Sequence, residues 1–263
     1  MNDSLKISRE LFSVYSPLKT NLSLLKSYQN ITNDYINIDN VRDVYNNLIT
    51  KNFLNESVIK SAFIKRFLIK KSPRLNTTVF ELNTGGSRAD LCLMNGKSSV
   101  FEIKTEYDTY DRLSKQLQDY TDFFDKIFVI VPEGEQEIIK SNIPTHVGII
   151  YYYQNRLGNV DFIVEREAIR NKLINPYKQL ESLTKSELSL LADTNVKSLS
   201  KDALIKILLE KHSSKYINQI YRETIKKKYY DKWNFLYDNV NSIYPLDFQW
   251  FFKNNIDYKI IYK

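Results

Sequence analysis

The chain has 263 residues, 43% of them hydrophobic, and a formal net charge of +7. Its single cysteine, Cys92, excludes an intrachain disulfide framework and fits a reducing cytoplasm, where we expect it to be a small core residue. The sequence has no run of about 18 apolar residues and no export signal over residues 1–5, so we expect a cytoplasmic protein without a membrane partner.

The charge changes sign twice along the chain. Residues 1–76 carry a net charge of +6, residues 77–165 carry −6, and residues 166–263 carry +7. Basic flanks attract a phosphate backbone without reading its sequence, although solvated lysine-rich helices would give the same composition. The acidic centre does not suit a purely electrostatic nucleic-acid binder. It makes better sense if some of its carboxylates hold cations.

Helical patterns dominate the first part of the chain. Residues 4–30 have loose helical spacing, Asp39 can cap a helix that follows it, and Asn55 can cap another that ends near Ser72-Pro73. Basic residues gather on the second of these helices or near its end: Lys60, Lys65, Arg66, Lys70 and Lys71.

The central part of the chain predicts strands. Residues 77–82 are rich in β-branched and aromatic residues, and Gly85-Gly86 is typical of a turn. Asn95-Gly96 joins two apolar runs, over residues 87–94 and 100–104, and predicts a hairpin because both residues tolerate a positive φ.

Helices and strands alternate after this hairpin. Asp108-Thr109 offers N-caps for a helix over about residues 110–124, and further elements are predicted in the order strand, helix, strand, over residues 126–131, 135–141 and 147–153. This order predicts an α/β fold, with a mixed sheet that contains an antiparallel hairpin and a helical crossover.

The pattern becomes all-helical from about residue 167, with helices predicted over residues 182–191, 201–211 and 215–239. We therefore expect an N-terminal helical arm (1–38), an α/β core (39–165) and a basic helical C-terminal region (166–263). Residues 226–233 interleave lysines with aromatics, a pattern that can grip a backbone and stack on bases. A helix with core aromatics and solvated lysines is the alternative.

One polar cluster in the predicted hairpin indicates a reaction. Side chains alternate along a strand, so Glu102 and Lys104 share a face, and Asp90 on the partner strand can join them. Two carboxylates and a lysine suit a divalent metal site that acts on a phosphodiester. Lys104 can orient or deprotonate the attacking water, or stabilise developing negative charge. A surface Glu102–Lys104 pair and a structural Asp90–Arg88 ion pair are the alternatives.

These residues also carry a family resemblance. Asp90, followed after eleven residues by Glu102-Ile103-Lys104, resembles the signature of the PD-(D/E)xK nucleases, which include restriction endonucleases, Holliday-junction resolvases and RecB-like exonucleases. Gln116 and Tyr120 resemble the Gln-xxx-Tyr element of the RecB-like members. The run from Glu81 to Tyr120 is similar to a group of uncharacterised bacterial and phage proteins of this superfamily. Ala89 stands where the signature name has Pro.

The resemblance covers roughly residues 40–155 and implies a restriction-endonuclease-like core. It also implies a nuclease that hydrolyses DNA with Mg²⁺ or Mn²⁺, assisted by Lys104. The implied metal ligands are three carboxylates and one carbonyl: Glu81, Asp90, Glu102 and Ile103. Glu56, on a predicted helix, is the alternative to Glu81. The implied substrate contacts come from two arginines and the Gln-xxx-Tyr pair: Arg88, Arg112, Gln116 and Tyr120.

Two other kinds of function stay open at this point. The chain can be a nucleic-acid-binding module that no longer cuts. It can also be an interaction protein, such as an inhibitor, immunity or defence factor of a mobile element, with a protein partner on its C-terminal helices. The sequence does not choose between DNA and RNA or between endo- and exonuclease, and a homodimer is one way for a single-site nuclease to cut both strands.

Overall fold

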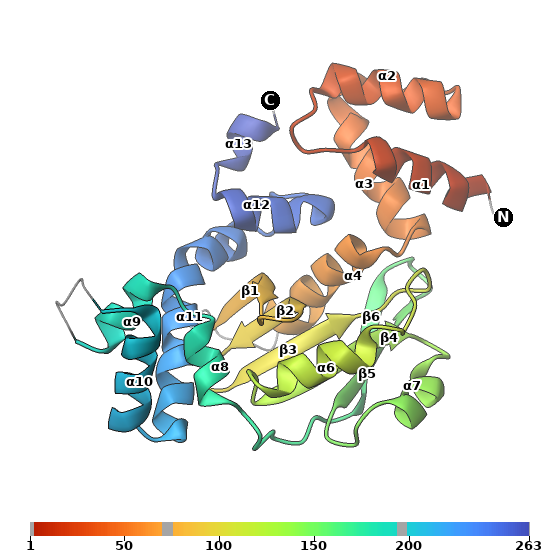
Figure 1. The fold of residues 1–263 in the computed structure, drawn as a ribbon. Coiled ribbons are helices and arrows are strands. Elements are labelled where there is room, and N and C mark those ends of the chain that lie inside the picture. The colour runs from red at the N-terminus through yellow and green to blue at the C-terminus, as the bar shows by residue number, and fades with distance from the viewer. Residues whose placement is uncertain (1–2, 70–75, 194–198, 263) are drawn as a thin grey trace. The chain divides into compact units, whose positions relative to one another are not determined.

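The computed structural model describes residues 3–69, 76–193 and 199–262 (Figure 1). The predicted stop at Ser72-Pro73 and two of the predicted basic residues, Lys70 and Lys71, lie outside these ranges.

The chain forms two compact units, each built from separate stretches of sequence. One unit, which we call the helical unit, takes residues 1–71, 153–161 and 234–263. The other, which we call the sheet unit, takes residues 72–152 and 162–233. Each unit is described by itself below.

Six strands form one sheet whose spatial order follows the sequence. The strands are β1 (Thr77–Asn83), β2 (Arg88–Met94), β3 (Ser98–Ile103), β4 (Lys126–Pro132), β5 (Gly148–Gln154) and β6 (Val160–Arg166). The first three pair antiparallel, whereas β3, β4 and β5 pair parallel. Helices α6 (Leu113–Thr121) and α7 (Gln136–Asn142) connect the parallel strands. The predicted α/β class, with an antiparallel hairpin and a helical crossover in a mixed sheet, is confirmed, but β6 was not expected.

The hairpin between β2 and β3 turns where the sequence predicted. Gly96 has a φ of +82°, while Asn95 is outside the left-handed region, so only the glycine needs the conformational freedom expected of both residues. The Asn95 N–H donates to the Lys97 carbonyl (3.0 Å), and Met94 pairs with Ser98 across the turn.

Helix α6 packs on the sheet (Figure 1) and buries one stripe of side chains: Leu113, Leu117 and Tyr120. It begins at Leu113 rather than near residue 110. The expected cap fails because the Asp108 carboxylate turns back to accept from the N–H and hydroxyl of Thr105, both at 2.7 Å. This local turn uses the side chain that would otherwise cap a longer helix.

After β6 the described chain continues with α8 (Pro176–Glu181), α9 (Lys185–Leu191), α10 (Lys201–Lys211) and α11 (Ser214–Asp238). The single helix predicted over residues 182–191 is wrong at its start. Asn175 caps α8, and Thr184 forms a capping box with Glu187 that begins α9. Helices α10 and α11 match their predictions, and Ser200 caps α10 as its sequence suggests.

A buried carboxylate fastens α11 to the sheet. Asp125, 1% exposed, precedes β4 and accepts from the Ser98 N–H (2.9 Å) at the start of β3. Arg222 on α11 donates to the same carboxylate at 3.2 Å, and the Asn218 amide lies 3.4 Å from it. A buried carboxylate needs such donors, so these residues of α11 are part of the structure of the sheet unit.

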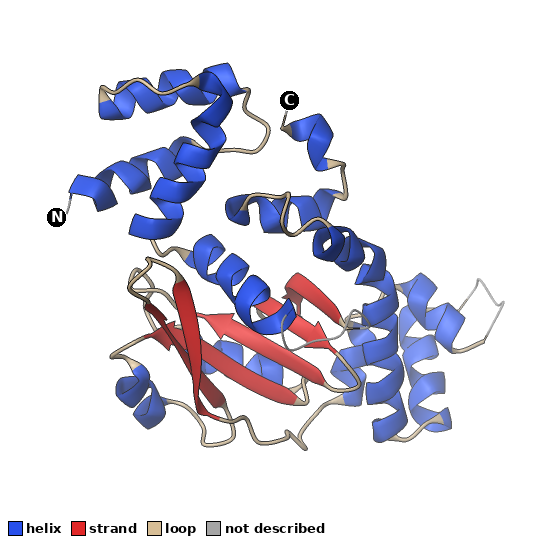
Figure 2. Ribbon diagram, turned by 180° about the vertical axis from the view of Figure 1, so that it is seen from behind, coloured by secondary structure: helices blue, strands red, loops and turns tan. Residues whose placement is uncertain are grey.

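The helical unit combines both ends of the described chain (helices blue in Figure 2). Its elements before the sheet are α1 (Asp3–Val14), α2 (Asn21–Thr32), η1 (Ile38–Asn40), α3 (Val41–Asn52), α4 (Glu56–Phe63) and η2 (Ile64–Leu68), and those after it are η3 (Pro245–Asp247), α12 (Phe248–Asn254) and α13 (Tyr258–Ile261). The two sets are tied by Asp247, whose carboxylate accepts from the hydroxyls of Tyr15 (2.9 Å) and Tyr262 (2.6 Å).

Asn55 caps α4 as predicted, whereas the helix expected after Asp39 starts at Val41 behind the short turn η1. Within the residues that the structure describes, no helix has the length and apolar character needed to cross a bilayer.

Candidate active site

Three neighbouring strands of the sheet unit present the carboxylates that the sequence singled out. Glu81 on β1 lies across from Asp90 on β2 in the antiparallel register. The pairing of β2 with β3 ends at Leu91 and Phe101, so Asp90 and Glu102 come one position after the last pair. The three acidic residues therefore occupy neighbouring positions of β1, β2 and β3, where β2 and β3 stop pairing.

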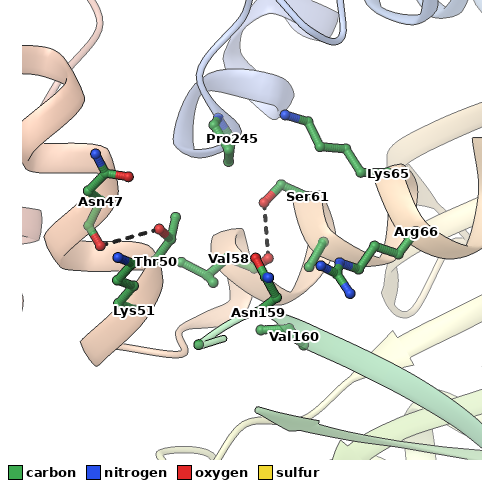
Figure 3. A pocket seen from close by; sticks show the side chains of 12 residues that line it. Asn47, Thr50, Lys51, Val58, Ser61, Lys65, Arg66, Asn159, Val160 and Pro245 are labelled. Atoms are coloured by element: carbon green, nitrogen blue, oxygen red, sulfur yellow. Dashed lines mark hydrogen bonds between the residues drawn. The ribbon is translucent and has the colours of Figure 1, made fainter. Parts of the chain in front are cut away.

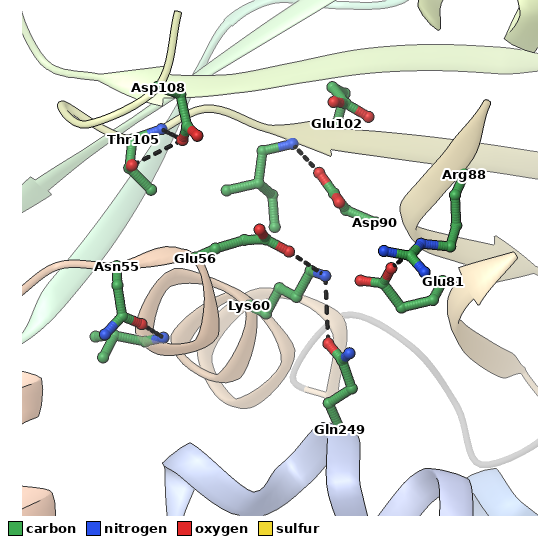
Figure 4. Close-up of polar contacts among 12 residues, drawn as sticks. Asn55, Glu56, Lys60, Glu81, Arg88, Asp90, Glu102, Thr105, Asp108 and Gln249 are labelled. Carbon is green, nitrogen blue, oxygen red and sulfur yellow. Dashed lines mark hydrogen bonds and ion pairs between the residues drawn. The ribbon is translucent and has the colours of Figure 1, made fainter. Parts of the chain in front are cut away.

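The side chain of Asp90 continues the hydrogen bonding between β2 and β3 beyond their last backbone pair. Its Oδ2 accepts from the Ile103 N–H at 2.7 Å (Figure 4), which gives that backbone donor a partner beyond the last strand pair. One carboxylate oxygen of Asp90 and one of Glu81 lie within 4.8 Å of each other. Glu81 also forms an ion pair with Arg88, 2.5 Å between Oε2 and Nε.

Glu81 has an unusual backbone conformation. Its φ is +54°, in the left-handed region that L-residues other than glycine rarely adopt, and it is the only residue of β1 with a positive φ. Such conformations cost of the order of 1 kcal/mol and persist where surrounding contacts impose them, often at functional sites. The Arg88 pair and the neighbouring Asp90 are such surroundings.

Glu102 is buried, with 1% of its surface exposed. Its Oε1 accepts from Lys104 Nζ (3.0 Å) and from Gln116 Nε2 (2.5 Å), and its Oε2 accepts from the Tyr120 hydroxyl (2.6 Å). The predicted Glu102–Lys104 face is thus present, and it is enclosed by helix α6 rather than lying on the surface.

Burial dominates the protonation of this carboxylate. Desolvation raises the pKa of Glu102 above its ordinary value, against the lowering by the Lys104 charge and by the Tyr120 hydrogen bond. The pKa of the Tyr120 hydroxyl is raised as well, first by burial and then by the Glu102 charge, so the tyrosine stays a neutral donor.

Lys104 links the strand and the helix. Its ammonium lies 3.0 Å from Glu102 Oε1 and 3.0 Å from Gln116 Oε1. Its backbone N–H donates to the Ile130 carbonyl (2.8 Å), which fixes the residue directly after β3. Gln116 and Tyr120, one helical turn apart, both reach the same carboxylate, so the predicted Gln-xxx-Tyr pair faces the cluster.

The turn between β1 and β2, which contains Gly85-Gly86, packs closely against α6. Asp119 on α6 accepts from the Ser87 hydroxyl at 2.6 Å. A Cβ on Gly86 would lie 2.6 Å from an Asp119 carboxylate oxygen, so only glycine fits there without movement. This contact places α6, and with it Gln116 and Tyr120, over β3.

The other predicted site residues have different surroundings. Arg112 is exposed and stands at the N-cap position of α6. Arg88 is exposed except for its pair with Glu81. Ile103 uses its N–H for Asp90, and a ligand role for its carbonyl stays a prediction. In the predicted stacking segment, Trp233 is 3% exposed and belongs to the core, so it offers no face to a base.

Two acidic residues were missed by the sequence analysis. Asp119 could have been found from its position three residues after Gln116, on the same side of the predicted helix. Asp125 had a weaker signal, an acidic residue one position before a strand that is apolar except for its first residue, Lys126. Its main partners on α11 are distant in sequence.

The comparison with protein families decides the kinship of this chain. The family described as bacteriophage P4 protein cII matches residues 50–250, which is more than half of the chain. The chain belongs to the bacteriophage P4 protein cII family. The matched span contains all of the described sheet and helix α11. It also contains Glu102 with its partners Lys104, Gln116 and Tyr120, which we call the Glu102 cluster, so these are features of a member of this phage protein family.

A curated relative agrees with this assignment. Protein cII of enterobacteria phage P4 is 29% identical over 185 residues, which cover 67% of this chain and 69% of that protein. Among solved structures, a protein of unknown function from Silicibacter pomeroyi matches 48% of this chain and 84% of its own, at 19% identity and a TM-score of 0.31. The family name identifies a phage protein and states no reaction.

Proposed function

We propose that this cII-family protein is a metal-dependent nuclease of the PD-(D/E)xK type that hydrolyses DNA. The observation that carries the proposal is the buried Lys104 ammonium, 3.0 Å from both the Glu102 carboxylate and the Gln116 amide. Holding a buried lysine between a carboxylate and a helix-borne amide costs more than forming an exposed ion pair. The arrangement is a suitable one for a reaction at a phosphate.

The donor set fits a divalent cation. Mg²⁺ and Mn²⁺ prefer carboxylate oxygens, and oxygens of Glu81 and Asp90 lie within 4.8 Å of each other. Glu81, Asp90 and the adjacent Glu102 would hold the ion. When bound, it supplies charge neutralisation at the scissile phosphate and acidifies a water molecule.

The protein side chains have distinct tasks in this proposal. Lys104 can donate to the attacking water or to the phosphate oxygen on which negative charge develops. Gln116 and Tyr120 donate to Glu102 and fix its orientation. Tyr120 remains protonated, because burial raises its pKa, and so it keeps its donor role across the working pH range.

The raised pKa of Glu102 gives the reaction a pH dependence. A metal ligand must be ionised, and Glu102 takes up its proton at a higher pH than an ordinary glutamate. Activity should therefore be lost as pH falls through this raised pKa and recovered as pH rises. The expected result is a rising limb in the pH profile of cleavage at saturating Mg²⁺, absent from the profile of DNA binding measured in EDTA.

Cleavage of linear and supercoiled DNA in Mg²⁺, in Mn²⁺ and in EDTA tests the proposal. We expect cleavage only with metal, and a loss of about 100-fold or more in Asp90→Asn and in Lys104→Gln. Matched controls at two exposed positions, Asp111→Asn just before α6 and Lys115→Gln in its first turn, should keep full activity. Glu56→Gln compared with Glu81→Gln identifies the third carboxylate. Undiminished cleavage in both Asp90→Asn and Lys104→Gln would rule this mechanism out.

A second candidate, a nucleic-acid-binding protein that does not cut, is favoured by one observation. Both oxygens of Glu102 already accept from protein donors, and the residue is 1% exposed. A buried carboxylate with a purely structural role has the same properties. This candidate predicts salt-sensitive binding of DNA or RNA in EDTA, equal in the wild type and in Asp90→Asn, with no metal-dependent turnover.

A further inference from the structure

The helical unit contains a pocket of about 310 Å³ that the candidate active site does not use (Figure 3). Its walls come from the end of α3, from α4 and η2, from the turn between β5 and β6, and from η3. The polar side chains that matter here are three cations and two amides: Lys51, Lys65, Arg66, Asn47 and Asn159.

The pocket has an excess of positive charge. Arg66 is paired with Asp161. Lys51 and Lys65, in contrast, have no carboxylate partner within the described residues. The hydroxyls of Thr50 and Ser61 in the wall donate to backbone carbonyls, so the lysines and the amides are the donors left to a ligand.

The backbone that carries two of these cations is irregular. Residues Ile64–Leu68 form a π-helical turn, with the Ile69 N–H donating to the Ile64 carbonyl. Single π-turns inside helices are uncommon and occur frequently at functional sites. This one places Lys65 and Arg66 on the pocket wall.

The ammonium of Lys65 is held without being neutralised. It lies 5.1 Å from the centre of the Phe248 ring, a cation–π contact that leaves its charge available. Burial lowers the pKa of Lys65, and a bound anion would offset that cost. A cation in this state is a better anion ligand than a solvated lysine.

We infer that this pocket binds the phosphate group of a nucleotide, either a free nucleotide or a nucleotide unit of a nucleic-acid strand. The pocket volume is at the lower end of the range of small-ligand sites, and its donors match phosphate oxygens. The inference does not depend on the proposed nuclease, because all the lining residues belong to the helical unit and none belongs to the Glu102 cluster.

Titration calorimetry of the whole protein in EDTA tests this site with four probes: inorganic phosphate, adenosine monophosphate, an oligodeoxynucleotide with a 5′-phosphate and the same oligodeoxynucleotide without it. We expect saturable binding of at least one phosphate-bearing probe, with phosphate competing. The Lys51→Gln/Lys65→Gln double variant should lose about tenfold or more in affinity. Binding of the mononucleotide alone identifies a free nucleotide as the ligand, and a preference for the oligonucleotide identifies a strand.

The matched control is Lys6→Gln/Lys26→Gln, which removes the same charge from exposed positions of the helical unit that do not line the pocket. Circular dichroism checks that both double variants are folded. An equal loss of affinity in the two variants, or no saturable binding of any probe to the wild type, overturns the inference. Loss of DNA cleavage in Asp90→Asn with unchanged phosphate binding separates this site from the proposed nuclease.

Discussion

Two buried carboxylates, one in each unit, differ in the hydrogen-bond donors that surround them. Glu102 is 1% exposed and has three donors, one of them a lysine. Asp247 is equally buried but has two tyrosine hydroxyls on one oxygen, while its Oδ1 is buried without a hydrogen-bond partner among the described residues. Asp247 is therefore expected to weaken the folded state when it ionises.

The pH dependence of stability tests this view of Asp247. Burial raises the pKa of Asp247 from 3.8 to about 6, so the folded state holds the proton more tightly than the unfolded chain. Stability should fall as pH rises from about 4 to about 6, by about 3 kcal/mol at most. Asp247→Asn should remove this dependence and be more stable than the wild type at pH 8, in urea unfolding followed at several pH values. An equal effect of Asn at exposed Asp34 would refute the assignment.

The conformation of Glu81 leads to a second residue-scale prediction. Alanine and glycine both delete its side chain, but only glycine accepts a φ of +54° without strain. Glu81→Gly should therefore be more stable than Glu81→Ala by about 1 kcal/mol. The measurement is the difference between their free energies of unfolding in denaturant. Equal stabilities, or a more stable alanine variant, would mean that the backbone is relaxed at this position.

At the scale of elements, the attachment of α6 to the first hairpin depends on Gly86. Gly86→Ala should destabilise the protein by about 1 to 3 kcal/mol, since the new methyl group would meet the Asp119 carboxylate 2.6 Å away. Asp119→Ala removes the obstacle, so the double variant should lose less stability than the sum of the two single variants. A double-mutant cycle in urea measures this coupling. Strict additivity would show that the hairpin and the helix do not touch here.

The sequence predicted the regular parts of this arrangement. Alternation along residues 100–104 was enough to place Glu102 beside Lys104, and helical spacing was enough to bring Gln116 and Tyr120 together. The prediction failed at the start of α6, because Asp108 accepts a hydrogen bond from Thr105 and does not cap the helix. It also failed for β6, the last strand of the sheet, whose polar residues gave no apolar run to indicate a strand.

The enclosure of Glu102 and the role of Asp125 could not be predicted for a different reason. Both depend on partners brought from elsewhere in the chain. Asn218 and Arg222, which reach Asp125, are 93 and 97 residues away from it. Periodicity describes which residues share a face of one element, but it carries no signal for which distant element covers that face.

For the whole molecule, the two compact units offer a direct test, because each contains one of the two tryptophans. Trp233 belongs to the sheet unit and Trp250 to the helical unit. Single-tryptophan variants, Trp250→Phe and Trp233→Phe, should therefore report the unfolding of each unit by fluorescence. Asp125→Asn should lower the stability reported by Trp233 by about 3 kcal/mol, through the loss of a buried charge pair with Arg222.

The same substitution should leave the transition reported by Trp250 nearly unchanged. Asp122→Asn, which removes a more exposed ion pair with Lys178, is the matched control and should have little effect on either tryptophan. Equal shifts of both tryptophans in the Asp125→Asn background would show that the units unfold as one.

The discontinuous helical unit also has a consequence for protein synthesis. Tyr15 and its partner Asp247 are 232 residues apart, so α1 to α4 leave the ribosome long before the segment that completes their core. At ordinary rates of translation this interval is roughly 10 to 50 s. During it, α3 and α4 lack the contacts that η3 later makes with them. A chaperone bound to the nascent chain would find its site there, while the sheet unit is still being made.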